Sequence, residues 1–391
     1  MSNIRLLDIE TDYRAIFALS QFAFQYELTP EDITKKKQEA RRHTIWGWME
    51  EGELAAKLHL IPLSCTIHGT VFPMGGISSV ATWPEYRRQG MIKHLLRHAL
   101  HYMKKNGQTV SFLAPFSFAF YRKYGWELTF AKKRYTIPMA HFKRDWHEKG
   151  YVRRSHVYTP ALNAIYNTYA KNYTGMLIRD ERWWNERVLK DRDHIAIAYN
   201  DEGKPEGYIL FYVKEKVFTA KEIAYTSING RNTLLSFIAN HDSMAETVEM
   251  TVPENDNLPI LLDNPRFEQK INPYFMARIV DVRRFFQQYP FQNIAKPIQL
   301  HIEDSFLPEN SGTYQLHPSP EGVQVTFIPK KHSANESGSI FLTVQMLAMI
   351  CLGYKRPVEL FAAGLIRGER SHVERLEASV PQQEPYFADF F

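Results

Sequence analysis

The chain has 391 residues, of which 44% are hydrophobic and 14% aromatic, and its formal net charge at pH 7 is +5. This length is long for one domain and sufficient for two or three, each with its own apolar core. The charge is mild and no clustered basic and aromatic face stands out, so nucleic-acid binding is not expected. No stretch approaches the roughly 20 apolar residues of a membrane span, so a membrane protein is not expected either.

Cysteine usage and the first residues both bear on the cellular compartment. The chain has two cysteines, Cys65 and Cys351, which lie far apart in apolar segments. They cannot form a disulfide framework, and their context is typical of small buried hydrophobic side chains. The first residues contain no apolar segment of the kind found in signal peptides. We therefore expect a cytoplasmic protein.

Residues 77–92 predict a strand, a short basic loop and the first turn of a helix. The β-branched residues within 77–82 favour a strand, which Pro84 ends because proline has no backbone donor. From residue 92 onward, apolar residues recur at the spacing of one buried helical face. These residues are Ile92, Leu95, Leu96, Ala99, Leu100 and Met103.

The basic loop is a candidate anion-binding site. Arg87, Arg88 and Gly90 lie where the helix begins, and there the free N–H groups and the helix dipole attract an anion such as a diphosphate. Gly90 lacks a Cβ atom, so phosphate oxygens could approach the main chain closely. His94, His98 and His101 follow on one stripe of the helix. With no acidic or cysteine ligand nearby, a metal site is not expected there.

A second motif follows about thirty residues later. An apolar strand at 109–114 is closed by Pro115, and a short helix at 117–124 ends at Gly125. The helix carries Tyr121 and Tyr124, which are three positions apart and so lie near one face. Taken alone, both tyrosines could be ordinary packing residues.

Together the two motifs resemble those of the GNAT-type N-acetyltransferases, and in particular the Eis-like (enhanced intracellular survival) aminoglycoside acetyltransferases of bacteria. The family's pyrophosphate loop reads Arg/Gln-x-x-Gly-x-Gly/Ala, and residues 87–92 match it except at Ile92. The resemblance covers the whole chain and implies an α/β (α+β) fold in three parts. These are a catalytic GNAT domain (1–150), a degenerate GNAT-like domain (151–288) and a sterol-carrier-like domain (289–391).

The resemblance also implies a co-substrate, acetyl-CoA, and a set of site residues without a metal. Tyr121 would be the general acid that protonates the departing CoA thiolate, and Tyr124 would be structural. The general base would be the terminal carboxylate of Phe391, the last residue of an apolar tail. The residues implied to bind acetyl-CoA are Val80, Ala81, Thr82, Arg87, Arg88, Gln89, Gly90 and Met91.

By the same resemblance the acceptor is a primary amine of an aminoglycoside or similar polyamine, and the assembly is a homo-oligomer, a hexamer. A polyamine pocket needs acidic residues, for which Glu27, Asp32 and Asp389 are candidates. Two alternatives stay open. One is acetylation of a protein or peptide lysine, and the other is a non-catalytic protein that binds acyl-CoA or a lipid.

The later parts of the chain carry weaker signals. The helix predicted over 232–241 lacks an Arg-x-x-Gly loop before it, so the second domain would have no cofactor site. Trp183 and Trp184 in that domain are interpreted as packing residues. Alternating residues predict strands at 298–303, 312–316 and 322–328, and an apolar run predicts a helix over 342–352.

Overall fold

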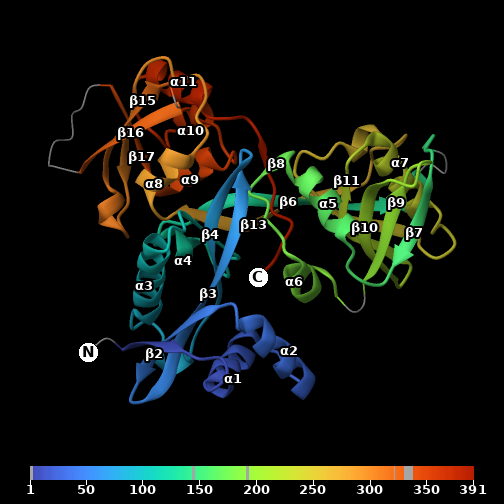
Figure 1. Cartoon of the computed structure of the whole chain (residues 1–391), viewed down its shortest axis with the longest axis horizontal. Helices are drawn as coiled ribbons and strands as arrows, with labels where there is room; N and C mark the ends of the chain where they lie inside the picture. Colours follow the sequence, from blue (N-terminus) through green and yellow to red (C-terminus); the bar gives the residue numbers. More distant parts are fainter. Residues whose placement is uncertain (1–2, 143–145, 191–192, 321, 330–337) are drawn as a thin grey trace. The chain divides into compact units, whose positions relative to one another are not determined.

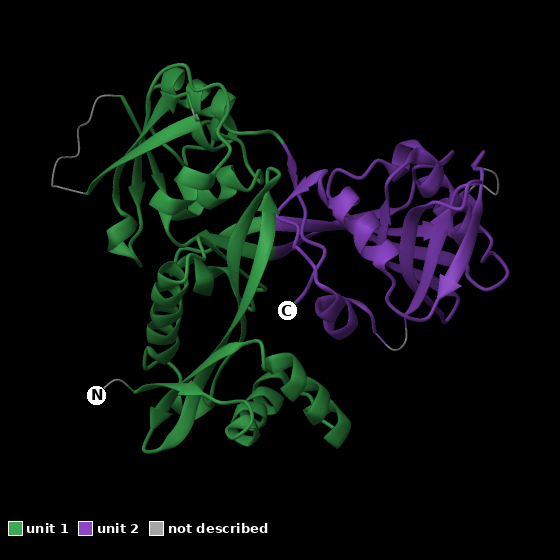
Figure 2. Ribbon diagram, viewed as in Figure 1, with its two compact units in different colours: residues 1–129, 275–382, 391 green, residues 130–274, 383–390 purple. Residues whose placement is uncertain are grey.

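The computed structural model describes residues 3–142, 146–190, 193–320, 322–329 and 338–391. The chain divides into two compact units (Figure 2): residues 1–129, 275–382 and 391 form the first, and residues 130–274 and 383–390 form the second. Both units mix helices and strands, as expected. The first and third predicted domains lie in the same compact unit. This division therefore does not test the domain boundaries predicted near residues 150 and 288, and these stay predictions.

The first unit is built on a sheet with the strand order β1-β2-β3-β4-β5-β13 (Figure 1). β5 runs parallel to β4, and the end of β13 pairs antiparallel with β5. Because the β4–β5 pairing stops at Ile77 and Leu113, residues 78–82 of β4 continue beyond the end of β5. The bounds are β1 (Ile4–Leu7), β2 (Thr44–Glu50), β3 (Glu53–Ile67), β4 (Thr70–Thr82), β5 (Val110–Leu113) and β13 (Glu268–Ile279).

Four helices belong to the first part of this unit: α1 (Tyr13–Phe24), α2 (Pro30–Ala40), α3 (Met91–Lys105) and α4 (Phe118–Arg122). The predicted apolar face of α3 is confirmed. Five of its six residues are fully buried against the sheet, and only Ile92 is half-buried, because Met91 takes the first buried position. Both cysteines are buried and free, as expected.

The remainder of the first unit contains a four-stranded sheet, β16-β15-β14-β17, and four helices. The helix predicted over residues 342–352 is too long at its start, because the structure has a strand, β17, over Ser339–Thr343, and the helix α9 begins at Val344. Thr343 caps that helix by accepting from the N–H of Met346. The other bounds are β14 (Ile298–Glu303), β15 (Gly312–Ser319), β16 (Gly322–Pro329), α8 (Val282–Gln288), α9 (Val344–Cys351), α10 (Pro357–Ala362) and α11 (Arg370–Ser379).

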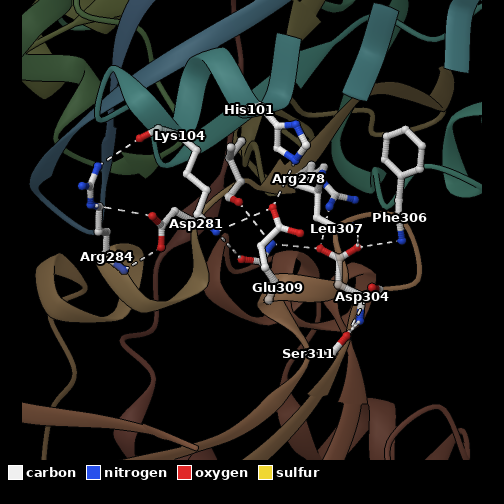
Figure 3. Close-up of polar contacts among 12 residues, drawn as sticks. His101, Lys104, Arg278, Asp281, Arg284, Asp304, Phe306, Leu307, Glu309 and Ser311 are labelled. Atoms are coloured by element: carbon white, nitrogen blue, oxygen red, sulfur yellow. Dashed lines mark hydrogen bonds and ion pairs between the residues drawn. The ribbon is translucent and has the colours of Figure 1, made fainter. Parts of the chain in front are cut away.

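A buried ion pair attaches this second sheet to the first (Figure 3). Arg278 of β13 and Asp304, which follows β14, lie 2.5 Å apart with both side chains 0% exposed. Asp304 also accepts the main-chain N–H groups of Phe306 at 3.1 Å and Leu307 at 2.9 Å. Arg278 also donates a hydrogen bond to the carbonyl oxygen of Tyr124. These bonds compensate the cost of burying two charges, and they tie the end of α4 to the last strand of the sheet.

The second unit contains a sheet with the order β6-β12-β11-β10-β9-β7 and a short parallel pair, β8 with β18. No helix in the described part of the chain has both the length and the apolar content that crossing a membrane requires. The bounds are β6 (Glu127–Pro138), β7 (Tyr151–Ser155), β8 (Tyr173–Thr174), β9 (His194–Tyr199), β10 (Pro205–Lys214), β11 (Val217–Tyr225), β12 (Thr247–Val252), β18 (Glu384–Pro385), α5 (Pro160–Ala170), α6 (Glu181–Trp183) and α7 (Ile228–Ala239).

Buried charges hold the C-terminal tail in the second unit. The guanidinium of Arg179, 1% exposed, pairs with Asp389 of the tail at 3.0 Å and with Glu222 of β11 at 2.7 Å. The Trp183 indole N–H donates to Asp389 at 2.7 Å. Trp183 and Trp184 are both buried, which agrees with the packing role predicted for them. The segment just before the C-terminal residue is therefore fixed by specific polar contacts.

Candidate active site

A cavity of about 680 Å³ opens in the first unit where β4 continues past the end of β5. Its wall combines the end of β4, the loop that follows, the first turn of α3, and aromatic side chains from the region of α4. The residues that line it are Ala23, Phe24, Val80, Ala81, Thr82, Tyr86, Arg87, Arg88, Gly90, Met91, Ile92, Lys93, Phe116, Phe120 and Tyr124. Of the eight residues predicted to bind acetyl-CoA, seven line this cavity. Gln89 does not; its side chain donates to the carbonyl of Glu85 at 3.3 Å.

One end of the cavity is arranged for an anion. Gly90 is the N-terminal cap of α3 and has φ 83°, a left-handed conformation that suits glycine. The N–H groups of the first helical turn have no partner within the helix and carry the positive end of its dipole. Arg87 and Arg88, both exposed, add two fixed positive charges beside them. This arrangement can hold a diphosphate.

We expect Gly90→Ala to raise the Kd of the protein for acetyl-CoA about tenfold, since one hydrogen bond and a closely approaching phosphate account for roughly 1–1.5 kcal/mol. A Cβ atom here would meet only His94 Cδ2, at 4.0 Å, so nothing inside the protein clashes. The added methyl group instead occupies space that the phosphate oxygens need. Isothermal titration calorimetry with acetyl-CoA measures the effect.

The matched control for this substitution is Gly107→Ala, just after α3. Gly107 has φ 75° and open space around its Cβ position, so it carries the same conformational cost outside the cavity. Both variants should lose about 1 kcal/mol of unfolding free energy. An equal loss of affinity in both would show that Gly90 acts through stability and not through contact with the ligand.

The main chain of β4 is irregular where it reaches the cavity. Lys57 of β3 pairs with Ala81, and His59 pairs with Ser78, so Leu58 alone opposes two residues, Ser79 and Val80. This is a β-bulge, and it removes main-chain groups from the ladder between the strands. Ser79 has φ 51° in the left-handed region. Main-chain donors at such a bulge can face a bound carbonyl group instead of a neighbouring strand.

The structure separates the two tyrosines. Tyr121 lies on α4, whereas Tyr124 lies beyond the end of that helix at Arg122, so the helix predicted over 117–124 is too long. Tyr124 lines the cavity, and Tyr121 is not among the residues that line it. Tyr121 is 3% exposed and packs against the rings of Phe116 and Phe120, with centroid distances of 5.4 and 5.1 Å. Burial raises the pKa of Tyr121, so its phenol stays protonated at neutral pH. Tyr124, which the sequence indicates as structural, forms part of the cavity wall, and its ring lies 4.9 Å from that of Phe306.

The C-terminal residue is packed into the sheet of the first unit. Phe391 is 5% exposed, and its ring lies 5.1 Å from the ring of Phe275 in an edge-on contact. A Cβ atom on Gly76 would come within 2.8 Å of the Phe391 ring, so the glycine makes room for it. Gly76 precedes Val80 by four residues on β4. The chain end is thus held on the strand that leads to the cavity.

The acidic residues predicted to bind substrate have different settings. Asp32 closes the capping box of α2, accepting from the N–H and hydroxyl of Thr29 at 3.1 and 2.9 Å. Those contacts lower the pKa of Asp32, beginning with the bond from the Thr29 N–H. The carboxylate of Asp389 is buried in its ion pair with Arg179. Glu27 is exposed in the α1–α2 connection, so it is the predicted acid that faces solvent.

The three histidines of α3 are exposed, as expected, and two of them pack on tryptophans of β2. His94 lies 5.5 Å from the ring of Trp48, and His98 lies 5.1 Å from that of Trp46. Within the residues that the structure describes, no group of three metal-ligating side chains comes together.

The second unit repeats the strand–helix–strand arrangement, and among its described residues the helix α7 has no Arg-x-x-Gly loop before it. β11, α7 and β12 follow one another, and β11 pairs in parallel with β12. At the start of α7 the carboxylate of Glu206 accepts from the Ser227 hydroxyl at 2.7 Å and from the amides of Asn229 and Asn200 at 3.0 Å each. The chain's own carboxylate therefore takes the place that a phosphate would need. These contacts explain why the start of α7 needs no arginine-containing loop before it.

Sequence reasoning missed the apolar part of the cavity wall. Phe24 at the end of α1 is 49% exposed, and Phe116 is 71% exposed. Both line the cavity. Large exposed aromatic residues indicate binding surfaces, but their exposure becomes visible only in the folded chain. In the sequence, Phe24 and Phe116 do not stand out from the many other apolar residues.

Comparison with known proteins supports this description. Family models described as acetyltransferase (GNAT) domains match residues 3–129 and 175–279, and a sterol carrier protein domain matches residues 282–388. The N-acetyltransferase Eis of Mycobacterium tuberculosis (strain CDC 1551 / Oshkosh) is 24% identical over 402 residues, which covers 96% of each protein. A related N-acetyltransferase of Streptomyces griseus is 21% identical over 78% of this chain and 79% of its own.

Two solved structures share the fold over the full length. A protein from Enterococcus faecalis V583, described as a probable N-acyltransferase, has a TM-score of 0.90 at 27% identity and covers 99% of each chain. Eis1 from Mycobacterium abscessus has a TM-score of 0.82 at 18% identity, covering 99% of this chain and 100% of its own. The second likeness concerns the fold alone.

The tandem GNAT domains, the sterol-carrier-like domain and the full-length relatives agree with the geometry of the cavity. The order of domains predicted from the sequence is the one that the family models find. The first GNAT domain contains the strand bulge and a helix start that can hold an anion, and in the described part of the second domain Glu206 contacts the residues at the start of α7. The chain belongs to the Eis-like N-acetyltransferases of the GNAT type.

Proposed function

We propose that this enzyme transfers the acetyl group of acetyl-CoA directly to a primary amine of an aminoglycoside or similar polyamine. In this proposal Tyr121 is the general acid and the terminal carboxylate of Phe391 is the general base. The observation that carries it is the cavity of the first unit, where the start of α3, Arg87 and Arg88 meet the free end of β4. Such a cavity fits a diphosphate at one end and an extended thioester arm along the strand.

The main chain around the bulge would stabilise the transition state. As the amine attacks the thioester carbon, negative charge develops on the carbonyl oxygen, and an N–H group fixed at the strand can donate to it. Val80 and Thr82 line the cavity and supply main-chain groups there. These donors need no reorganisation during the reaction, because the pairing of β4 with β5 stops at Ile77, before both residues.

Proton transfers complete the reaction. An amine is protonated at neutral pH, so the Phe391 carboxylate would take a proton from it before or during attack. An α-carboxyl group has an ordinary pKa of roughly 3.5, and burial must raise that pKa for it to act as an effective base. As the C–S bond breaks, the leaving sulfur gains the phenol proton of Tyr121. The resulting phenolate takes back the second proton that the attacking nitrogen must lose, and the carboxyl group of Phe391 returns its proton to solvent. No covalent acyl-enzyme is needed, because both cysteines are buried and their thiol pKa values are raised by burial.

The acceptor class follows from the family resemblance, together with a cytoplasmic location and a hexameric assembly. The first experiment measures the release of CoA thiol from acetyl-CoA over a panel of aminoglycosides, with sedimentation of the same protein to test the assembly. Turnover on kanamycin-like compounds supports the proposal. Faster turnover on lysine peptides points instead to a protein acetyltransferase. A lack of thiol release with every amine, with lipid retained through purification, indicates a binding protein.

A further inference from the structure

A fully buried lysine lies behind the bulge of β4, and the reaction described above does not use it. Lys57 of β3 is 0% exposed. Its Nζ atom donates to the carbonyl oxygen of Ser79 at 3.0 Å and to the Ser79 hydroxyl at 2.7 Å. It also lies 3.4 Å from Nε2 of His59. Burying an amine costs folding free energy unless hydrogen-bond partners surround it. The position of Lys57 therefore needs a structural or functional explanation.

The bulge creates a need for such a donor. Two residues of β4, Ser79 and Val80, oppose the single residue Leu58 of β3, and the extra residue is left without a ladder partner. Ser79 adopts φ 51°, a conformation that residues with a Cβ atom rarely adopt. The Lys57 amine binds both the carbonyl and the side chain of this strained residue. It therefore compensates the lost ladder bond and holds Ser79 in its unusual conformation.

We propose that Lys57 is a positioning residue of the acetyl-transfer site: through Ser79 it fixes the β4 bulge and so holds the main chain of Val80 at the cavity wall, where the acyl carbonyl binds. This inference rests on the proposed use of acetyl-CoA. Lys57 does not touch the reacting groups. It acts through the strand, which distinguishes it from Tyr121 and Phe391.

The groups around Lys57 favour a neutral amine. Burial, and to a smaller extent the charge of Lys36 on α2, lower the pKa of Lys57 to about 7. His59 faces it from β3, with His43 beyond at 3.3 Å between the two Nδ1 atoms. The neighbours on the side of α1 are uncharged at neutral pH. They are the Ser20 hydroxyl, 3.5 Å from that of Ser79, and the phenol of Tyr26, which is hydrogen-bonded to Ser20.

The experiment compares the binding of acetyl-CoA and of CoA to the full chain by calorimetry. CoA has the diphosphate and the pantetheine arm but no acyl carbonyl, so the ratio of the two affinities reports on the binding of that carbonyl. In Lys57→Met the preference for acetyl-CoA over CoA should fall about five- to tenfold, the value of one hydrogen bond. The affinity for CoA itself should stay within about twofold. Lys105→Met, at the exposed end of α3, removes the same charge and should change neither affinity.

A second substitution separates positioning from simple packing. Glycine adopts positive φ freely, so in a Ser79→Gly background the bulge depends less on the amine. Lys57→Met should then reduce the acetyl-CoA preference less than it does in the wild type. A loss of equal size in both backgrounds, or an unchanged preference in Lys57→Met, overturns the proposal. If the wild type does not bind acetyl-CoA at all, the proposed function itself fails and the inference fails with it.

Thermal unfolding provides a readout that loss of packing would not produce. Because the pKa of Lys57 is lower in the folded than in the unfolded chain, the unfolded state binds more protons between about pH 7 and 10. The stability contributed by Lys57 therefore rises with pH across this window and is lost toward pH 7. From pH 7 to pH 9 the wild-type Tm should rise relative to that of Lys57→Met. A constant difference between the two would mean that Lys57 is charged in the folded protein, with no neutral amine behind the bulge. Should Lys57→Met fail to fold, Ser79→Ala removes the 2.7 Å contact with Lys57, together with the 3.5 Å contact with the Ser20 hydroxyl, and should still reduce the acetyl-CoA preference.

Discussion

Tyr121→Phe is expected to lower kcat for thiol release about 100-fold or more, with little change in the affinity for acetyl-CoA. Loss of a general acid typically costs 10²–10⁴ in rate. The substitution removes only the hydroxyl, and the ring contacts with Phe116 and Phe120 remain. Because the phenol pKa is raised by burial, the wild-type acid stays protonated throughout the neutral range. Steady-state kinetics with saturating acetyl-CoA measures the change.

The matched control for this prediction is Tyr124→Phe, three positions further along the chain and just beyond the end of α4. Tyr124 lines the cavity with its ring, so its hydroxyl is the competing candidate for the acid. We expect this variant to keep kcat within about threefold, as its role is to form the wall and its carbonyl is held by Arg278. A large loss in Tyr124→Phe, with normal turnover in Tyr121→Phe, would transfer the acid role to Tyr124.

The second large effect concerns the end of the chain. Two glycines added after Phe391 should reduce turnover about 100-fold or more, the usual contribution of a general base. The extension moves the terminal carboxylate by up to about 7 Å and leaves a neutral peptide group in its place. Phe391 can keep its contact with Phe275, so stability and acetyl-CoA binding should remain close to wild type. The same thiol-release assay compares the native and extended proteins.

A substitution distant in sequence tests the same idea without altering the terminus. Gly76→Ala places a Cβ atom within 2.8 Å of the Phe391 ring and should displace the chain end. Turnover should fall in this variant as it does in the extended protein. Two glycines added at the N-terminus serve as the control for the extension. Equal turnover in the native and C-terminally extended proteins would leave the enzyme without Phe391 as its base.

Local signals in the sequence were sufficient for the parts of the site that lie close together along the chain. The helix α3, its glycine cap and the adjacent arginines were predicted because spacing, dipole and conformational freedom all act within a few residues. The short helix that carries Tyr121, with Gly125 at φ 88° after it, was predicted for the same reason. The specific roles of these residues came from the family resemblance, since spacing alone does not distinguish Tyr121 from Tyr124.

Features that depend on contacts between distant residues could not be predicted. The bulge at Ser79 depends on the register between β3 and β4, and Lys57 gives no local sign that it lies behind that bulge. The strand β17 was missed because Ile340 and Leu342 continue into the apolar helix α9 without a break in hydropathy. The cap at Thr343 marks the boundary, but a threonine in an apolar run is a weak signal on its own.

The pairing of β13 with β5 has a consequence for how the protein can be divided into fragments. Residues Met276–Ile279 complete the first sheet, although they lie at the end of the second GNAT domain match, which covers residues 175–279. The segment 130–274 is therefore inserted between two parts of the chain that form the first sheet. It is not a module appended after that sheet is complete. A fragment ending near residue 150 would expose the fully buried strand Val110–Leu113 as an open, apolar edge, which favours aggregation. A fragment of the first GNAT domain that covers this edge would need residues 275–279 reattached by a short linker, and it would still lack the Phe391 carboxylate proposed as the base.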